Sequence, residues 1–219
     1  FDRSVKELYW RQNGKKFNNN SRQGDNPALQ ISPTDNGLVS IIYVSKPSII
    51  KYKDFSKFQN FVMEKHSPSA VEIHKNLDFP LENFSEIYTR YSKALVGVGT
   101  SKGFDTENNL ELELVALENP YTDNMADGIE ILALYNGNPR AFSNLNVFER
   151  SNTDSSVNTF VVKTNDKGVA VVEVKNDCTY LIDNVIIRPA NKKLFKDRGV
   201  IWESLWAALT FSVIRSNGI

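Results

Sequence analysis

The chain has 219 residues and balances 26 lysines and arginines against 26 aspartates and glutamates, so its formal net charge is zero. This balance gives no electrostatic footprint for a polyanionic partner and predicts that the protein does not bind nucleic acid. Hydrophobic residues make up 41% of the chain, as in globular proteins, and no apolar run approaches the ~20 residues of a membrane span. The length suits one or two domains, and we expect two.

Strand patterns alternate with turn signals at the beginning of the chain. Val5–Trp10 has a β-rich composition and is followed by Asn13-Gly14, a strong turn dipeptide. Leu38–Val44 is short and rich in β-branched residues, which predicts a buried strand.

A short helical segment follows. From Tyr52 to Lys65 the apolar residues recur every three to four positions, which predicts an amphipathic helix with Asp54 as its N-cap. Ser69 is expected to cap a second, shorter helix that ends before Phe79-Pro80. This insert occupies about residues 53–83.

The stretch Tyr88–Gly99 joins this first half to a second half with steady strand patterns. It brings Arg90 and Lys93 into an apolar run, and buried cations are costly unless they are paired or hydrogen-bonded. Glu111 and Glu113 are the natural acidic partners if their strand lies nearby. The alternatives are an anion-binding crevice and an ordinary strand with charged residues on its solvated face.

Three segments have mixed signals. Phe84–Tyr91 fits a helical stripe as well as a strand, and we expect it to become strand at about Thr89. Residues 191–199 are basic and are expected to form an exposed loop. Trp202–Val213 is predicted to be a strand in its later part.

The second half reads as short strands separated by turn signals, which favours an antiparallel sandwich over a βαβ layout. These strands are Leu110–Leu117, Ile129–Tyr135, Leu145–Glu149, Asn158–Lys163, Val169–Val174 and Thr179–Ile187. We predict a mainly β protein with two antiparallel β-sandwich domains, immunoglobulin-like or prealbumin-like, at residues 1–104 and 105–219. The first carries the helical insert, and the final strand either stays in the second domain or returns to the first.

Six residues are predicted to line a ligand-binding crevice between the domains, with aromatic walls and a few charged anchors. They are Tyr88, Arg90, Lys93, Glu113, Tyr121 and Trp202. The Arg90 guanidinium suits bidentate binding of a carboxylate or a metal chelate. The competing interpretation is that the same residues form a structural ion-pair network.

Chemistry-bearing residues are few. His66 and His74 are the two histidines and the candidate metal ligands, but they lack the i, i+4 spacing of a helical metal pair, and the alternative for each is a surface histidine. Cys178, the single cysteine, has no cationic neighbours and is expected to be a small hydrophobe at the start of a strand. No nucleophile elbow, phosphate loop or HExxH motif occurs, so we predict that the protein is not an enzyme.

Taken together, several segments resemble a bacterial periplasmic family of unknown function that is described as a substrate-specific component of nickel or cobalt uptake. The residues that carry the resemblance are Tyr88–Val96, Leu112–Tyr121, Gly137–Pro139, Thr164–Gly168, Tyr180–Val185 and Trp202–Phe211.

The resemblance implies an exported, non-enzymatic β-sandwich protein that is associated with transition-metal uptake. Its implied ligand is a nickel or cobalt ion or a metal chelate, and its implied partner is a membrane metal transporter. A periplasmic or secreted location follows, and a chain that begins at Phe1 suits a protein whose signal peptide has been removed or trimmed. The alternative function is a structural or adhesion-type β-sandwich module without a small-molecule ligand.

Overall fold

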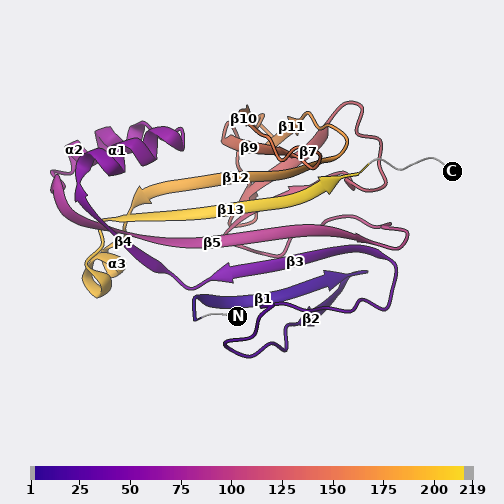
Figure 1. The fold of residues 1–219 in the computed structure, drawn as a ribbon. Helices are drawn as coiled ribbons and strands as arrows, with labels where there is room; N and C mark the ends of the chain where they lie inside the picture. Colours follow the sequence, from indigo (N-terminus) through magenta and orange to yellow (C-terminus); the bar gives the residue numbers. More distant parts are fainter. Residues whose placement is uncertain (1–2, 215–219) are drawn as a thin grey trace. The chain divides into compact units, whose positions relative to one another are not determined.

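The computed structural model describes residues 3–214, and within them the chain is mainly β, as the sequence predicts. The strands are β1 (Val5–Gln12), β2 (Lys15–Asn18), β3 (Gly37–Ser45), β4 (Ser48–Asp54), β5 (Glu82–Val98), β6 (Leu112–Ala116), β7 (Ile129–Tyr135), β8 (Asn138–Pro139), β9 (Asn144–Ser151), β10 (Val157–Lys163), β11 (Val169–Val172), β12 (Cys178–Pro189) and β13 (Trp202–Val213) (Figure 1). The helices are α1 (Phe55–Glu64), α2 (Ser69–Asn76) and α3 (Lys192–Arg198).

The strands form two sheets. The larger has the order β10-β9-β12-β13-β5-β3-β1-β2, and β4 pairs with β5. The smaller has the order β11-β7-β6, with β8 beside β7, and its pairs are antiparallel. A tight turn connects β7 to β8. Its two residues, Asn136 and Gly137, have φ angles of 50° and 72°, which is the left-handed backbone conformation that a two-residue hairpin turn requires. The immunoglobulin-like or prealbumin-like assignment stays a prediction.

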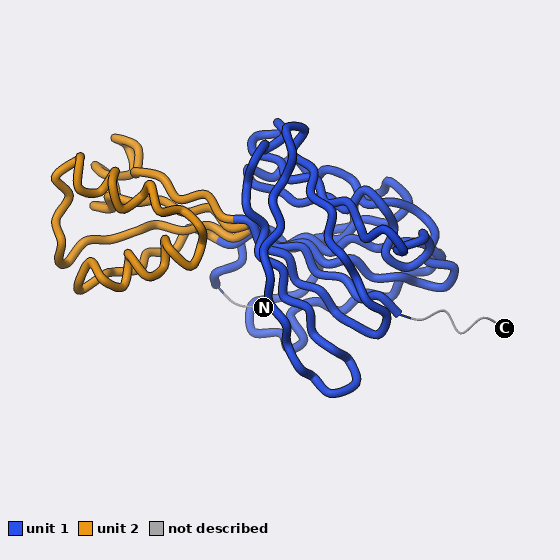
Figure 2. Tube along the Cα trace, turned by 90° about the horizontal axis from the view of Figure 1, so that it is seen from above, with its two compact units in different colours: residues 1–45, 91–184, 207–219 blue, residues 46–90, 185–206 orange. Residues whose placement is uncertain are grey.

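The described chain divides into two compact units, coloured separately in Figure 2. Unit 1 comprises residues 1–45, 91–184 and 207–219, and unit 2 comprises residues 46–90 and 185–206. Strands β5, β12 and β13 each contribute residues to both units. The domain boundary expected at residues 104 and 105 lies inside unit 1.

Unit 1 contains the smaller sheet and most of the larger one. Alternating residues of the strands point into its core, as the two-residue period of a half-buried strand requires. Its fully buried side chains include Ile42, Leu112, Ile129, Ile131, Leu145, Tyr180, Ile182 and Leu209. Two tyrosine hydroxyls form hydrogen bonds to residues distant in the chain. The Tyr91 hydroxyl donates to Glu111 at 3.1 Å, and the Tyr121 hydroxyl donates to the Leu95 carbonyl at 2.7 Å.

Unit 2 contains all three helices and an aromatic core. The amphipathic pattern turns Phe58 and Val62 of α1 inward, and both side chains are fully buried. The Phe58 ring lies 4.8 Å from the Trp202 ring and 5.4 Å from the Tyr52 ring, between centroids. Such ring pairs add to the stabilisation that their buried area gives.

The predicted helical insert is confirmed, with corrections at its ends. Asp54 caps α1 as predicted, because its side chain accepts a hydrogen bond from the Lys57 backbone N–H. The prediction that Ser69 caps α2 is wrong, since Ser69 is already helical and the N-cap position is Pro68, which makes no side-chain cap.

Two further segments differ from expectation. Phe84–Tyr91 is strand throughout, because it lies within β5. Its residues 84–88 pair with β4 and Tyr91 pairs with β3, and this sheet pairing overrides the helical spacing of its apolar residues. Residues 192–198 form α3 rather than a loop, since Asn191 caps its first turn and Gly199 ends it in the left-handed conformation.

Cys178 is buried at the first position of β12, as predicted. None of the helices within residues 3–214 has the length and apolar character needed to cross a membrane.

Candidate functional site

Lys93, one of the two cations of the central stretch, lies in an ion-pair cluster inside unit 1. Its side chain is 2% exposed, and its Nζ lies 3.0 Å from Asp105 and 2.9 Å from Glu113. A third contact, at 3.1 Å, is to the Thr106 carbonyl. The expected pairing of Lys93 with Glu113 is therefore confirmed.

The two carboxylates of this cluster are also hydrogen-bonded to backbone N–H groups. Asp105 accepts from Thr106 and Ala116, at 2.9 and 3.1 Å. Both Glu113 oxygens accept from the Asn108 N–H at 2.9 Å. Burial raises the pKa of Asp105, while Lys93 and these donors act in the opposite direction. Because Lys93 contacts both carboxylates and backbone N–H groups supply their other hydrogen bonds, Lys93 and Glu113 form an internal structural cluster of unit 1.

Trp202, a second predicted ligand contact, lies in the core of unit 2. Its side chain is fully buried, and its indole N–H donates to His74 Nδ1 at 3.0 Å. Indole nitrogen can only donate, so Nδ1 of His74 is an acceptor and the ring hydrogen resides on Nε2. Nε2 in turn donates to the Pro80 carbonyl at 3.1 Å.

This geometry corrects the expectation of a surface histidine at position 74. His74 is fully buried, and burial lowers its pKa, which keeps the ring neutral. Both ring nitrogens are engaged, so His74 does not fit the role of a metal ligand. His66 is exposed just after α1, with a φ of 53°. Within residues 3–214 no group of three or more His, Cys, Asp or Glu side chains is arranged to hold a metal ion.

Two further predicted contacts, Tyr88 and Arg90, line a groove of about 500 Å³ that lies entirely in unit 2. We call it the unit 2 groove; its lining also includes Ile50, Lys51, Tyr52, Lys57, Phe61, Glu86 and Trp206. Arg90 is exposed, and its guanidinium lies 5.1 Å from the Tyr88 ring centroid, within range of a cation–π contact.

The unit 2 groove has an aromatic wall built from a helix and a strand. Phe61 of α1 stacks on Trp206 of β13, with centroids 5.5 Å apart and ring planes 16° apart. The Lys65 ammonium lies 5.0 Å from the Trp206 ring centroid on the same wall. Flat rings and nearby cations favour a ligand that combines a planar group with negative charge.

Beneath this wall lies a buried carboxyl group, Glu86, which is 2% exposed. It accepts hydrogen bonds from the Tyr52 hydroxyl at 2.8 Å and from the Ser204 hydroxyl. The Trp206 indole donates to the same Ser204 oxygen at 2.9 Å. Burial raises the pKa of Glu86, and the two hydroxyl donors act against this shift. The network fixes the orientation of Tyr52 and Trp206.

The structure therefore divides the six predicted contacts between the units. Tyr88, Arg90 and Trp202 belong to unit 2, whereas Lys93, Glu113 and Tyr121 belong to unit 1. The groove residues that sequence reasoning missed are Lys51, Lys57, Phe61, Glu86 and Trp206. The sequence does contain a signal for Glu86. This acidic residue lies two positions after the apolar Phe84, so both side chains lie on the same face of the strand.

Comparison with known protein families assigns the chain to a family. A family model described as a domain of unknown function (DUF4198) matches residues 4–187, so the chain belongs to this family. No curated protein and no solved structure matches the chain.

Proposed function

We propose that this chain is a non-enzymatic, exported binding protein that holds a small anionic ligand in the unit 2 groove. The observation that carries the proposal is the composition of the groove, which combines three cationic side chains, Lys51, Lys57 and Arg90, with four aromatic ones. All three cations are exposed, whereas the single carboxyl group of the lining, Glu86, is buried. The groove therefore favours negative charge in its ligand.

The resemblance to components of nickel and cobalt uptake narrows the ligand class. A bare metal ion would need imidazole, thiolate or carboxylate ligands, and His74 has no free nitrogen to offer. A metal chelate with outward carboxylates needs cationic and planar partners instead, and a guanidinium binds carboxylate bidentately. We propose a nickel or cobalt chelate as the ligand and a membrane metal transporter as the partner.

Calorimetric titration tests the proposal with three probes: nickel citrate, citrate alone and nickel chloride. We expect nickel citrate to bind and Arg90→Ala to weaken it by about tenfold or more, since charged hydrogen bonds contribute about 1.5–3 kcal/mol. Arg150→Ala, which removes an exposed arginine of unit 1, is the matched control and should bind as the parent protein does. The proposal fails if nickel citrate does not bind, or if Arg90→Ala binds it with unchanged affinity.

A structural or adhesion-type module is the second candidate, and the Lys93 cluster favours it. Lys93 pairs with both Asp105 and Glu113 inside unit 1, and such a buried ion network suits the specification of one arrangement of that unit rather than the binding of a ligand. A thermal-shift screen separates the two functions, because a ligand that binds the folded state raises the melting temperature with concentration. A module without a ligand would show no such rise with metals, chelates or small anions.

A further inference from the structure

A pocket of about 420 Å³ lies in unit 1, where the hairpin of β1 and β2 meets the long connection from β2 to β3. We call it the hairpin pocket, and Figure 1 shows the connection running beside the hairpin. Its volume falls within the range of about 300–1,000 Å³ that is usual for small-molecule sites. None of its lining residues belongs to the unit 2 groove, so an inference drawn from this pocket is independent of the proposed function.

The hairpin pocket has a flat aromatic surface. Trp10 of β1 and Phe17 of β2 are partners across the hairpin, and their rings stack with centroids 4.0 Å apart and ring planes 10° apart. Both side chains line the pocket and are half-buried. A flat, partly open ring is a surface on which the C–H face of a sugar ring can stack, because both surfaces are apolar.

Amide side chains lie around the aromatic pair. Four of the lining residues carry an amide, namely Asn18, Asn19, Asn20 and Gln30. Asn18, Asn20 and Gln30 are exposed, so their amide groups are accessible to a ligand. An amide side chain both donates and accepts hydrogen bonds, as a sugar hydroxyl does. The lining therefore matches a ligand that carries several hydroxyl groups next to an apolar ring face.

Hydrogen bonds hold the amide-bearing connection against the hairpin. The Asn19 backbone N–H donates to the Leu8 carbonyl at 3.3 Å, and the Asn19 side chain donates to the Ala28 carbonyl at 3.3 Å. Near the end of the connection, the Gln12 side chain donates to the Asp35 carbonyl at 3.0 Å. These bonds position the pocket wall before a ligand arrives, which lowers the ordering cost of binding.

The charge of the hairpin pocket favours a neutral ligand. Among the described residues that line it, Asp25 is the single charged one, and its carboxylate accepts from the Arg22 backbone N–H at 2.6 Å. A carboxylate accepts hydrogen bonds from hydroxyl groups and repels anions. The pocket therefore suits a sugar without acidic substituents, in contrast to the anionic ligand proposed for the unit 2 groove.

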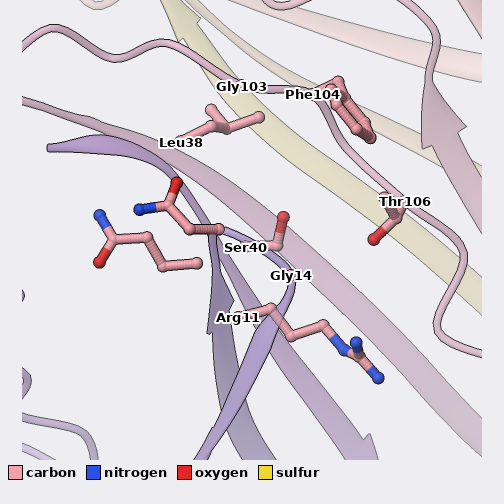
Figure 3. Close-up of a pocket in the computed structure, with 9 residues that line it drawn as sticks. Arg11, Gly14, Leu38, Ser40, Gly103, Phe104 and Thr106 are labelled. Carbon is pink, nitrogen blue, oxygen red and sulfur yellow. The ribbon is translucent and has the colours of Figure 1, made fainter. Parts of the chain in front are cut away.

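A smaller pocket of unit 1, of about 180 Å³, lies below the usual size range (Figure 3). Figure 3 shows the Arg11 guanidinium pointing away from Leu38 and Phe104, so its charge does not face the apolar part of that pocket. We assign no ligand to it.

We propose that the hairpin pocket binds a neutral saccharide. A pyranose ring stacks on the pair of Trp10 and Phe17, and its hydroxyls bond to Asn18, Asn20 and Gln30. Sugars whose hydroxyls are equatorial have the flattest C–H faces, so the glucose units of cellobiose fit this surface. Cellobiose is the probe. Sorbitol is the control ligand, because it is an open-chain polyol with the same hydroxyl chemistry and no ring face.

NMR titration of the ¹⁵N-labelled protein with cellobiose tests the proposal. We expect saturable shifts of the Trp10 indole N–H and of the side-chain amides of Asn18 and Gln30. Trp10→Ala should bind cellobiose about tenfold more weakly, since it removes the stacking surface. Sorbitol should bind the parent protein at least about tenfold more weakly than cellobiose does, for the same reason.

Gln30→Ala keeps the test decisive if Trp10→Ala does not fold, because Gln30 is exposed in the connection between β2 and β3. It should weaken cellobiose binding by about fivefold, the effect of one lost hydrogen bond. Gln23→Ala removes another exposed glutamine of the same connection, outside the pocket lining, and should bind cellobiose as the parent protein does.

Absence of saturable shifts, equal binding of sorbitol and cellobiose, or full affinity in Gln30→Ala would overturn the proposal. Failure of the nickel citrate experiment would leave this result unaffected, because the two sites share no residue.

Discussion

At the scale of single residues, burial decides what a charged side chain does. Arg90 and Lys93 are three positions apart on β5, yet one is exposed and the other is 3% exposed. Lys93 holds together two carboxylates that would otherwise repel each other in an apolar setting. Its role is therefore structural, whereas Arg90 remains accessible to a ligand.

Lys93→Ala should strongly destabilise the protein. Removal of one partner leaves Asp105 and Glu113 as uncompensated buried charges, which typically costs about 3–5 kcal/mol. Urea unfolding followed by circular dichroism measures this loss. Arg90→Ala is the control and should change the free energy of unfolding by less than about 1 kcal/mol. Similar values for the two variants would contradict the structural role of Lys93.

Glu86 predicts a measurable pH dependence. Its pKa is raised in the folded state above the ordinary value of 4.5, so the folded protein binds more protons than the unfolded chain. The contribution of Glu86 to the free energy of unfolding is fully present below pH 4.5. It is lost as the pH rises through the pKa that Glu86 has in the folded protein. One such group changes the free energy of unfolding by at most about 1.4 kcal/mol per pH unit.

Glu86→Gln removes this titration. The difference between the variant and the parent protein therefore reports Glu86 separately from Asp105, whose pKa is also raised. Unfolding free energies at pH 4, 5, 6 and 7 should fall less steeply with pH for the variant than for the parent protein. Parallel curves would show that the folded and unfolded pKa values of Glu86 are the same.

At the scale of elements, α1 is held by its apolar face rather than by its sequence propensity. Phe58 contacts the rings of Tyr52, Phe84 and Trp202, and it has no exposed surface. Loss of such a ring removes packing on several sides and leaves a cavity that the surrounding core fills only in part.

Phe58→Ala should lower the free energy of unfolding by about 3–5 kcal/mol. Chemical denaturation measures the change, and Gln59→Ala, on the exposed side of the same helix, should stay within about 0.5 kcal/mol of the parent protein. A small effect of Phe58→Ala would mean that α1 does not depend on this core.

At the scale of the whole molecule, stability comes from apolar cores and internal polar clusters in both units. Unit 1 relies on its two sheets and the Lys93 cluster, and unit 2 relies on aromatic packing around His74 and Trp202. Among residues 3–214, no group of three or more His, Cys, Asp or Glu side chains is arranged to hold a metal ion.

Metal removal should therefore leave the fold unchanged. Treatment with EDTA is expected to give the same melting temperature as the untreated protein, because residues 3–214 hold no group of three or more His, Cys, Asp or Glu side chains that could bind a metal ion, and both ring nitrogens of His74 are hydrogen-bonded. A fall in melting temperature that nickel chloride reverses would contradict this expectation and would indicate a structural metal site.

Local patterns in the sequence determined much of the secondary structure. The alternation in Leu110–Leu117, the turn at Asn13-Gly14 and the three-to-four spacing after Tyr52 correspond to β6, the β1–β2 hairpin and α1. Each of these signals arises from residues close together in the chain, so no distant contact is needed to interpret it.

Only the tertiary structure decided which side chains meet. Lys93 and Asp105 are twelve positions apart, and His74 and Trp202 are 128 apart, so their bonds depend on how distant strands and helices pack. The same holds for the wall of the unit 2 groove, where Phe61 and Trp206 come from different parts of the chain. Hydrophobic pattern fixes which face of an element is buried, but the partner across that face is set by the packing of the whole fold.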